Sequence, residues 1–248
     1  MDINRTLGID LNAYKEQQMR RRITQWLNRY DLSSFDQLIS KIKTDPEHKS
    51  RFMEYLTINT SHFFRDSSVF SAIDQIVVPD ITRQNRKPRI WSAGASIGAE
   101  IYSIAIMLME KGAVARELLA TDLDQAILAK AEAGVYHENQ ISNVDPVLLN
   151  KYFTRQDSNI YVIHESIRKQ VTFRQHDLLK DPYPSGFDLI LCRNVFIYFT
   201  AETQKRLINR WIFHSRVCRA DHGSWFLRPP KGQLLYLPKV LVKIYRGR

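Results

Sequence analysis

The stretch WSAGASIGAE, residues 91–100, combines two glycines four positions apart with a carboxylate. It follows a short apolar run and precedes a helical pattern, so Gly94 and Gly98 are expected at the carboxyl end of a strand. Glycine there lets backbone approach a ligand closely. The middle glycine of a dinucleotide fingerprint is missing, and no Gly-Lys-Ser/Thr follows, which disfavours a pyrophosphate. Tight packing of strand against helix, without a ligand, is the alternative.

A second acid follows the next predicted strand, ELLATD, which ends at Asp122. Nucleoside-binding α/β proteins hold the ribose hydroxyls with an acid at this place. Two carboxylate oxygens can accept from two adjacent hydroxyls, and Glu100 could meet a positive amine. A nucleoside with an amine and no diphosphate describes S-adenosylmethionine. NAD is the poorer alternative.

A sheet is needed to hold these residues. Strand patterns in RIWSAG, ELLATD, VTFRQHD and FDLILC alternate with helical patterns in EIYSIAIMLMEKG, QAILAKAEAGVY and AETQKRLINRWIF. This alternation predicts an α/β fold with a parallel sheet and right-handed crossovers. The N-terminal part is instead helical, with Met19, Ile23, Leu27 and Tyr30 at helical spacing in its first helix.

We therefore expect a small all-helical N-terminal domain, residues 1–85, and a Rossmann-like domain, residues 86–248, joined at the polar segment RQNRKP. The two cysteines, Cys192 and Cys218, lack the spacing of a metal site, so no metal is expected. There is no signal-like segment and no apolar run long enough to span a bilayer, which predicts a cytoplasmic protein.

Four motifs, in this order, resemble the CheR-type protein-glutamate O-methyltransferases of bacterial chemotaxis. They are TINTSHFFRDSSVF (57–70), WSAGASIGAEIYSIA, ATDLD and FDLILCRNVFIYF (187–199). The resemblance runs from about Leu11 to about Trp211 and includes the helical module. It implies transfer of the methyl group of S-adenosylmethionine to glutamate carboxylates of chemotaxis receptors, which yields methyl esters and S-adenosylhomocysteine.

The resemblance also implies the cofactor-binding positions, which are Asn59, Ser61, Arg65, Glu100, Asp122, Asp177, Leu178, Asn194 and Val195. Among them, Glu100 matches the contact to the methionine part and Asp122 the contact to the ribose. Asp177 and Leu178 match a pair that contacts adenine and is commonly Asn-Leu in the relatives.

The catalytic residues implied are Arg65 and Tyr198, where Tyr198 matches a tyrosine placed near the transferred methyl. A sulfonium methyl is already activated, and a glutamate, which titrates near about 4.3, is already ionised at neutral pH. No general base is therefore needed. Alignment for an in-line displacement and control of charge remain, and we expect Arg65 and Tyr198 to supply them.

The expected partner is the cytoplasmic helical domain of methyl-accepting receptors. Arg20, Arg21 and Arg22 stand off the apolar stripe of the first helix, so they are candidate substrate-binding residues; a solvated charged face is the alternative. Members of the family that dock on a receptor C-terminal peptide carry a glycine-rich signature in an inserted β-subdomain. The corresponding stretch here, YFTRQDSNIYVIHESIRKQ, has no glycine, so the resemblance does not imply this docking. The protein is expected to be a monomer without membrane insertion.

The net charge of +10 invites a third hypothesis, a nucleic-acid methyltransferase or binding protein. Residues 214–248 carry eight Lys or Arg against one acid, so the charge is mostly a tail effect. Base methyltransferases acting on exocyclic amines have an Asn/Asp-Pro-Pro-Tyr/Phe motif after the fourth strand, and this chain has RNVFIY there. No nucleic acid is expected as a partner.

The leading hypothesis is the active methyltransferase, and two departures from the family pattern motivate an alternative, a catalytically impaired CheR-like domain that binds cofactor or receptor. Residues 96–102 read SIGAEIY where relatives read Ser-Thr-Gly-Glu-Glu-Pro-Tyr, so Ile97, Ala99 and Ile101 differ. The tail, residues 214–248, lacks the Pro-Gly-Gly turn and the strand of the relatives. Our hypothesis is a frameshifted or divergent terminal hairpin, with QLLYLPKVLVKIY as a substitute.

Overall fold

The computed structural model describes residues 6–57, 61–83 and 87–213, and the short strands 226–227, 235–236 and 242–244. The chain divides into two compact units. The helical unit contains Met1–Asn59 and Val195–Ile208, and the sheet unit contains Thr60–Asn194 and Asn209–Arg248. Residues 60–85 thus group with the sheet, whereas the first domain expected from the sequence extends to residue 85.

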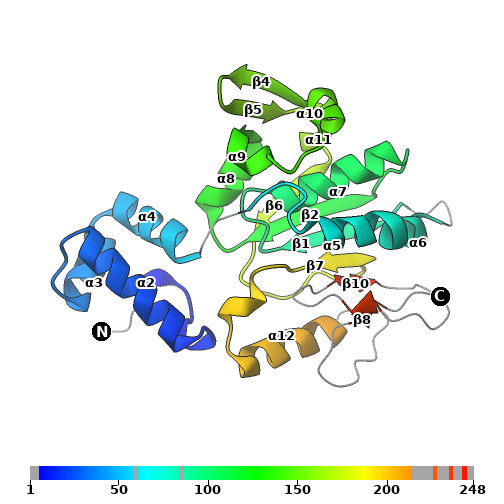
Figure 1. Ribbon diagram of the computed structural model, residues 1–248. Helices are drawn as coiled ribbons and strands as arrows, with labels where there is room; N and C mark the ends of the chain where they lie inside the picture. Colours follow the sequence, from blue (N-terminus) through cyan, green and yellow to red (C-terminus); the bar gives the residue numbers. More distant parts are fainter. Residues whose placement is uncertain are drawn as a thin grey trace. The chain divides into compact units, whose positions relative to one another are not determined.

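The helical unit is built on three helices, α2 (Glu16–Arg29), α3 (Phe35–Thr44) and α4 (Pro46–Thr57), preceded by the short turn η1 (Leu11–Ala13) (Figure 1). It also holds η3 (Phe196–Tyr198) and the beginning of α12 (Ala201–Phe213). These two segments return to the N-terminal residues from the end of the sheet, a connection that the sequence does not reveal.

The core of the helical unit forms around Trp26, which is almost fully buried and lies against Phe52. Its indole Nε1 donates to His48 Nε2 at 3.2 Å, so this buried imidazole is satisfied in its neutral form. Of the predicted stripe, Met19 is buried, whereas Ile23, Leu27 and Tyr30 are half-buried. The stripe therefore exists but is centred on Trp26, which was not among the predicted positions.

The sheet unit contains the expected parallel sheet, and the Rossmann-like fold class is confirmed. The order is β10-β7-β1-β2-β6, with β10 alone antiparallel. The strands are β1 (Arg89–Ala93), β2 (Glu117–Asp122), β6 (Val171–Gln175), β7 (Leu189–Leu191) and β10 (Val242–Ile244). Helix α7 (Ala99–Glu110) connects β1 to β2, and α8 (Gln125–Ala133) follows β2.

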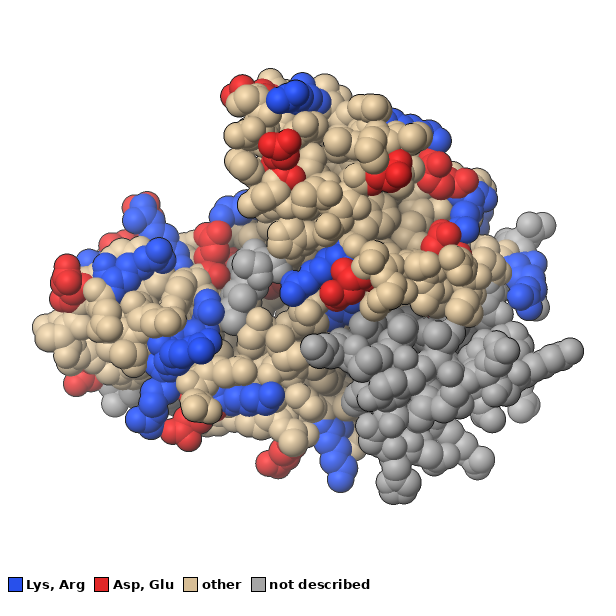
Figure 2. Space-filling view, viewed as in Figure 1, with Lys and Arg blue, Asp and Glu red and all other residues tan. Residues whose placement is uncertain are grey.

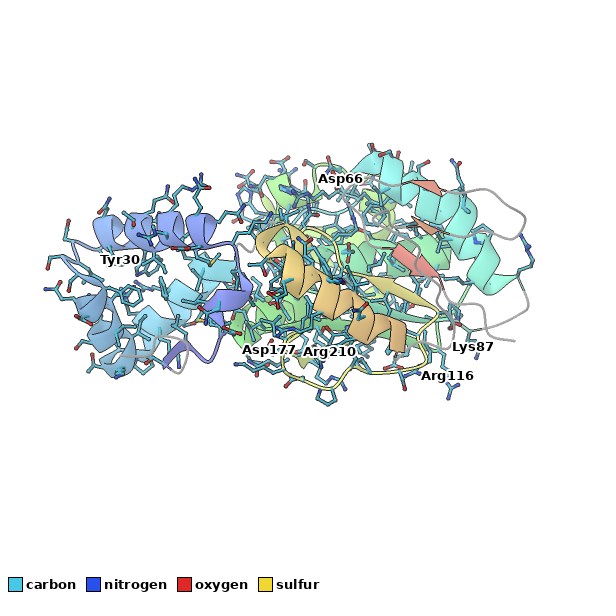
Figure 3. All side chains as sticks on the ribbon, turned by 90° about the horizontal axis from the view of Figure 1, so that it is seen from below. Tyr30, Asp66, Lys87, Arg116, Asp177 and Arg210 are labelled. Atoms are coloured by element: carbon cyan, nitrogen blue, oxygen red, sulfur yellow. The ribbon has the colours of Figure 1, made fainter. Side chains whose placement is uncertain are left out.

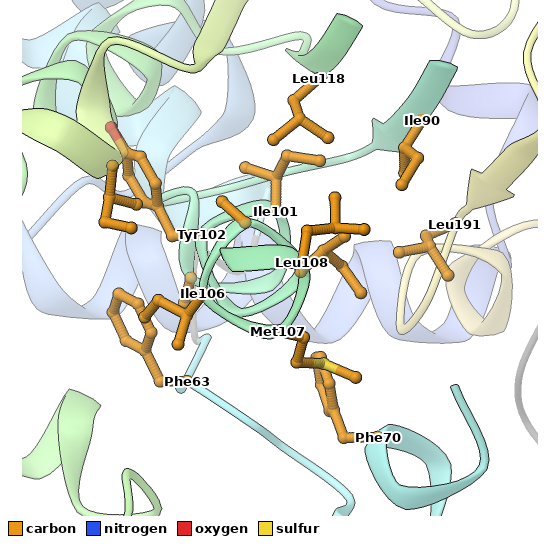
Figure 4. Close-up of a cluster of buried hydrophobic side chains, with 14 of the residues drawn as sticks. Phe63, Phe70, Ile90, Ile101, Tyr102, Ile106, Met107, Leu108, Leu118 and Leu191 are labelled. Atoms are coloured by element: carbon orange, nitrogen blue, oxygen red, sulfur yellow. The ribbon is translucent and has the colours of Figure 1, made fainter. Parts of the chain in front are cut away.

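Helix α7 lies at the centre of the main apolar cluster (Figure 4). Ile101, Tyr102 and Leu108 are fully buried on it, which explains why its sequence is apolar almost all round. Side chains of β1, β2 and β7 pack on one side. On the other side lie Phe63 and Phe70, the latter from the helical segment α5 (Ser67–Ala72), η2 (Ile73–Val77) and α6 (Val78–Thr82).

Between α8 and β6 the chain forms a small antiparallel sheet of order β3-β5-β4. Its strands are β3 (Val135–His137), β4 (Phe153–Asp157) and β5 (Ile160–Ile163). The short helices α9 (Glu138–Ile141), α10 (Pro146–Tyr152) and α11 (Glu165–Arg168) complete it. Tyr136 is anchored to the main core because its hydroxyl donates to the carbonyl of Ile97 at 2.9 Å.

The atypical tail contributes strands despite its unusual sequence. Strands β8 (Phe226–Leu227) and β9 (Leu235–Tyr236) pair with each other, and β10 extends the edge of the main sheet beside β7. The proposed substitute hairpin within QLLYLPKVLVKIY is therefore wrong: β9 pairs backward in the chain and β10 joins the sheet. The other tail residues, Cys218 among them, lie outside the described residues.

No helix in the described part of the chain combines the length and the apolar character needed to cross a membrane.

Candidate active site

The carboxyl ends of β1, β2, β6 and β7 bring most of the candidate residues to one edge of the parallel sheet. Figure 3 shows Asp177, which follows β6, far from Lys87 and Arg116, which precede β1 and β2. Ligands of open α/β sheets bind at the carboxyl edge. The predicted site residues of the sheet unit are therefore on the side where a ligand is expected.

The glycine loop has the backbone that its sequence predicts. Gly94 and Gly98 have φ near 78°, and Ser96 between them has φ of 51°. A Cβ at Gly98 would lie 3.1 Å from Ala131 Cβ and 3.2 Å from Phe173 Cε1. Gly98 thus serves packing of α7 against its neighbours, whereas Gly94 and Ser96 shape the loop at the sheet edge.

Asp122 lies at the carboxyl end of β2 and is held by the loop. Its Oδ2 accepts from the Ser96 amide at 2.8 Å, and its Oδ1 accepts from the Asp124 amide at 3.1 Å. Burial raises the pKa of this carboxyl above its ordinary value, while the two amides oppose the rise. Each oxygen keeps a second lone pair, so the carboxylate can still accept from hydroxyls.

Glu100 lies in the first turn of α7 and is largely buried. Its Oε1 accepts from the Ser92 hydroxyl at 2.7 Å, and its Oε2 faces Arg193 Nη1 at 3.4 Å. Arg193 follows β7, and its side chain is 3% exposed. Arg193 was not among the predicted site residues, although a charged residue directly after an apolar strand, within the CRNVFIYF motif, is a signal for a functional role.

The segment before α5 carries Arg65 on a strained turn. Phe64 and Asp66, on either side, have φ of 50° and 60°, a region that costs non-glycine residues about 1 kcal/mol or more. The Phe64 amide donates to Ser103 Oγ on α7 at 3.0 Å, which fixes the turn on the core. Ser61 is half-buried ahead of this turn, and Asn59 lies outside the described residues.

Asp177 and Leu178 begin a tight loop after β6. Asp177 Oδ1 accepts from the Leu179 amide at 2.8 Å, and Leu178 is buried. Arg210 on α12 is labelled beside Asp177 in Figure 3. It donates from Nη1 to the carbonyls of Leu178 and Leu179 at 3.2 and 2.9 Å, and its guanidinium lies 4.4 Å from the ring centroid of Tyr183. Arg210 is a second residue that the sequence analysis missed.

Asn194 and Val195 lie where the chain passes from one unit to the other. Asn194, with φ of 60°, ends the sheet-unit segment, and Val195 begins the helical-unit segment. Tyr198 is half-buried, and its carbonyl accepts from the Lys15 amide at 2.8 Å. The helical unit therefore positions Tyr198, whereas Arg65 belongs to the sheet unit.

The arginines of α2 are not equivalent. Lys and Arg side chains gather over α2 on the face shown in Figure 2. Arg20 and Arg21 are exposed, and Arg20 pairs with Glu16 at 2.8 Å. Arg22 instead packs 4.4 Å from the ring centroid of Tyr55 and donates to the Tyr55 carbonyl, so burial lowers its pKa. The expectation that Arg22 stands off the buried stripe is wrong.

Among the described residues, no group of three or more His, Cys, Asp and Glu side chains is arranged to hold a metal. The donors at the sheet edge suit an organic ligand instead: Asp122 can accept from hydroxyls, and Glu100 can accept from an amine. Cys192, beside them, is buried, and its pKa is raised well above the ordinary value by burial and by the nearby Glu100 and Asp122.

Comparisons with known proteins agree with this donor set. The family model described as "CheR methyltransferase, SAM binding domain" matches residues 59–219, and "CheR methyltransferase, all-alpha domain" matches residues 1–57. A "Chemotaxis protein methyltransferase" of Listeria monocytogenes is 41% identical over 203 residues, 81% of this chain and 77% of that protein. One of Borreliella burgdorferi is 30% identical over 247 residues, 90% and 87% of the two chains.

The matched domains decide between the cofactors left open by the sequence. S-adenosylmethionine is the cofactor, rather than NAD, and the chain is a methyltransferase. The resemblance of its four motifs is confirmed over nearly the whole chain, including the helical module. This protein belongs to the CheR methyltransferase family.

Proposed function

We propose that the protein transfers the methyl group of S-adenosylmethionine to glutamate side-chain carboxylates of chemotaxis receptors. The relatives are chemotaxis protein methyltransferases, which supports a substrate in chemotaxis. The observation that carries the proposal is the pair of acids beside the glycine loop, Glu100 in the first turn of α7 and Asp122 at the carboxyl end of β2. Glu100 binds the amine of the cofactor and Asp122 binds its ribose hydroxyls.

The chemistry requires little more than alignment. The cofactor, when bound, supplies a methyl group that is already activated. The substrate carboxylate is ionised at neutral pH, so the protein need not remove a proton. Arg65 holds an anionic group near the methyl, on a turn whose left-handed neighbours, Phe64 and Asp66, fix the direction of its backbone. Tyr198 is the second orienting donor.

The remaining assigned residues line the cofactor. Asp177 and Leu178 contact adenine on the loop that Arg210 holds. Ser61, Asn194 and Val195 are further contacts, and Asn59, outside the described residues, is proposed on the resemblance alone. Arg20 and Arg21, the exposed arginines of α2, bind the acidic helical domain of the receptor; Arg22 contributes mainly by packing on Tyr55.

The departures in the glycine loop favour an active enzyme over an impaired domain. Ile97, Ala99 and Ile101 are buried, Ala99 and Ile101 completely. A glutamate at position 99 would need a partner there, so alanine suits this site better. The three apolar residues thus pack in the hydrophobic core, and Glu100 remains in the first turn of α7.

A labelling experiment tests the proposal. Receptor-containing membranes are incubated with the protein and with S-adenosylmethionine that carries a labelled methyl group. We expect label on the receptor that alkali releases as methanol, because esters hydrolyse under conditions in which N-methyl groups persist. Receptors whose candidate glutamates are changed to alanine are the matched control. Label that resists alkali, or none with a protein that binds cofactor, would reject the glutamate assignment.

A further inference from the structure

The buried charge cluster behind the carboxyl ends of β1 and β7 has no assigned role. Arg193 Nη2 donates to Asp66 Oδ2 at 2.6 Å and to the Arg65 carbonyl at 2.8 Å, and Nη1 faces Glu100 Oε2 at 3.4 Å. Its guanidinium also lies 5.2 Å from the ring centroid of Phe70. One side chain thus contacts Glu100, which the proposed function places at the amine of the cofactor, and the turn of Arg65, which it places near the methyl.

Because the Arg193 side chain is buried, its charge must be balanced by protein groups rather than by water. The Arg193 side chain is 3% exposed, against 13% for Glu100 and 51% for Asp66. A buried guanidinium is tolerated only when it is paired and hydrogen-bonded. Its Nε–H is buried with no acceptor among the described residues, so one hydrogen-bond donor of the guanidinium is left unsatisfied by them.

The charge balance of the cluster suits a cationic ligand group. The Arg193 guanidinium faces two carboxylates, those of Asp66 and Glu100. The Ser92 hydroxyl and Arg193 hold the two oxygens of Glu100 from different sides, which fixes the plane of the carboxylate. Because the Glu100 carboxylate is already held in place, it can accept a hydrogen bond from an ammonium group without losing further conformational entropy on binding.

We propose that Arg193 is a positioning residue, which fixes Glu100 and the backbone of the Arg65 turn for recognition of the amino-acid part of S-adenosylmethionine. This rests on the proposed placement of the cofactor amine at Glu100 and of an anionic group at Arg65. Without Arg193, Glu100 loses its cationic partner and the strained turn loses the anchor of its carbonyl. The adenosine end, held by Asp122, does not depend on it.

Two ligands separate positioning from general stability. S-adenosylhomocysteine carries the amino-acid part, and methylthioadenosine lacks it. Calorimetric titration of the full chain should show that Arg193→Met lowers the affinity for S-adenosylhomocysteine on the order of tenfold or more. The affinity for methylthioadenosine should change less than about twofold. Arg193→Lys keeps the charge but loses the planar fork, so it should recover only part of the affinity.

A matched control is Arg89→Met, because Arg89 also pairs with a glutamate, Glu117 at 2.6 Å, but at the amino end of β1. It should lower the urea midpoint and leave both affinities unchanged. If Arg193→Met does not fold, Arg193→Lys and Ser92→Ala provide the same comparison. Equal losses for the two ligands, or unchanged binding of S-adenosylhomocysteine, would overturn the inference.

Glu100→Gln tests the underlying placement separately. It should weaken S-adenosylhomocysteine selectively, as the Arg193 variants do. A selective loss in Glu100→Gln without one in the Arg193 variants contradicts the role of Arg193 and leaves the proposed site intact. A selective loss in the Arg193 variants alone supports positioning through the Arg65 turn and rejects the placement of the amine at Glu100.

Discussion

The two ends of the parallel sheet each carry an arginine paired with a glutamate, and the two pairs differ in almost every respect. At the amino end, the side chains of Arg89 and Glu117 are 29% and 33% exposed. At the carboxyl end, those of Arg193 and Glu100 are 3% and 13% exposed. The first pair joins neighbouring strands, whereas the second holds a helix and a strained turn.

Backbone strain follows the same division. In the sheet unit, all the described non-glycine residues with positive φ lie near the carboxyl edge: Phe64, Asp66, Ser96 and Asn194. Such conformations persist only where surrounding contacts impose them, and they gather at functional sites. The contrast teaches that the amino end of the sheet is built for stability, while the carboxyl end gives up stability to place polar groups.

The largest expected effect distinguishes the acids at the two ends. Asp122→Ala should lower the affinity for S-adenosylhomocysteine about a hundredfold, because two charge-assisted hydrogen bonds to the ribose are lost. Glu117→Ala, on the same strand at the amino end, should leave the affinity unchanged. Isothermal titration of both variants checks this, and similar losses in the two would remove the functional distinction between the ends.

A smaller effect is expected at the adenine side of the carboxyl edge. Arg210→Ala frees the carbonyls of Leu178 and Leu179, so the loop becomes less ordered before binding. The affinities for S-adenosylhomocysteine and for methylthioadenosine should both fall, on the order of tenfold and by equal factors. A loss confined to S-adenosylhomocysteine would show that Arg210 acts on the amino-acid part instead.

The pH dependence of cofactor binding sharpens the role of Asp122. Burial raises the pKa of its carboxyl, so protonation begins above the ordinary aspartate value of about 3.9. A raised pKa means that the fold favours the protonated form, so the Asp122 carboxyl destabilises the folded state as pH rises through that pKa. Cofactor binding has the opposite dependence: it weakens as pH falls, because the ribose hydroxyls are bound by the ionised carboxylate. Titrations at decreasing pH should show this loss, and Asp122→Asn should remove that part of the dependence.

The smallest effect is expected in the helical unit. Burial lowers the pKa of His48, whose neutral Nε2 accepts from Trp26. A lowered folded-state pKa contributes stability that is present above the unfolded value of about 6.5 and is lost as pH falls through the folded value. Urea unfolding followed by tryptophan fluorescence should show that the free energy of unfolding decreases on acidification.

The exposed His137 provides the control for this prediction. His137→Gln should keep the acid sensitivity of the wild type, and His48→Gln should reduce it. If both variants keep the same sensitivity, the acid lability comes from another group and the pairing of His48 with Trp26 has no measurable part in it.

The sequence predicted the fold and the edge at which the site lies, because strand and helix periods and the glycine loop are local signals. It missed Arg193 and Arg210, whose partners lie far away in the chain: Arg193 contacts residues more than 90 positions distant. It misjudged Arg22 because the helical period cannot show that Tyr55 of α4 covers it. The return of residues 195–208 to the helical unit was hidden for the same reason.

The most direct test is a crystal structure of the protein with S-adenosylhomocysteine. We expect the ribose hydroxyls at Asp122, the amine at Glu100 with Arg193 still behind it, and adenine against Leu178. A ligand bound away from the carboxyl edge of the sheet, or bound there with Asp122 and Glu100 contacting only protein groups, would contradict the assignment of this edge as the methyl-transfer site.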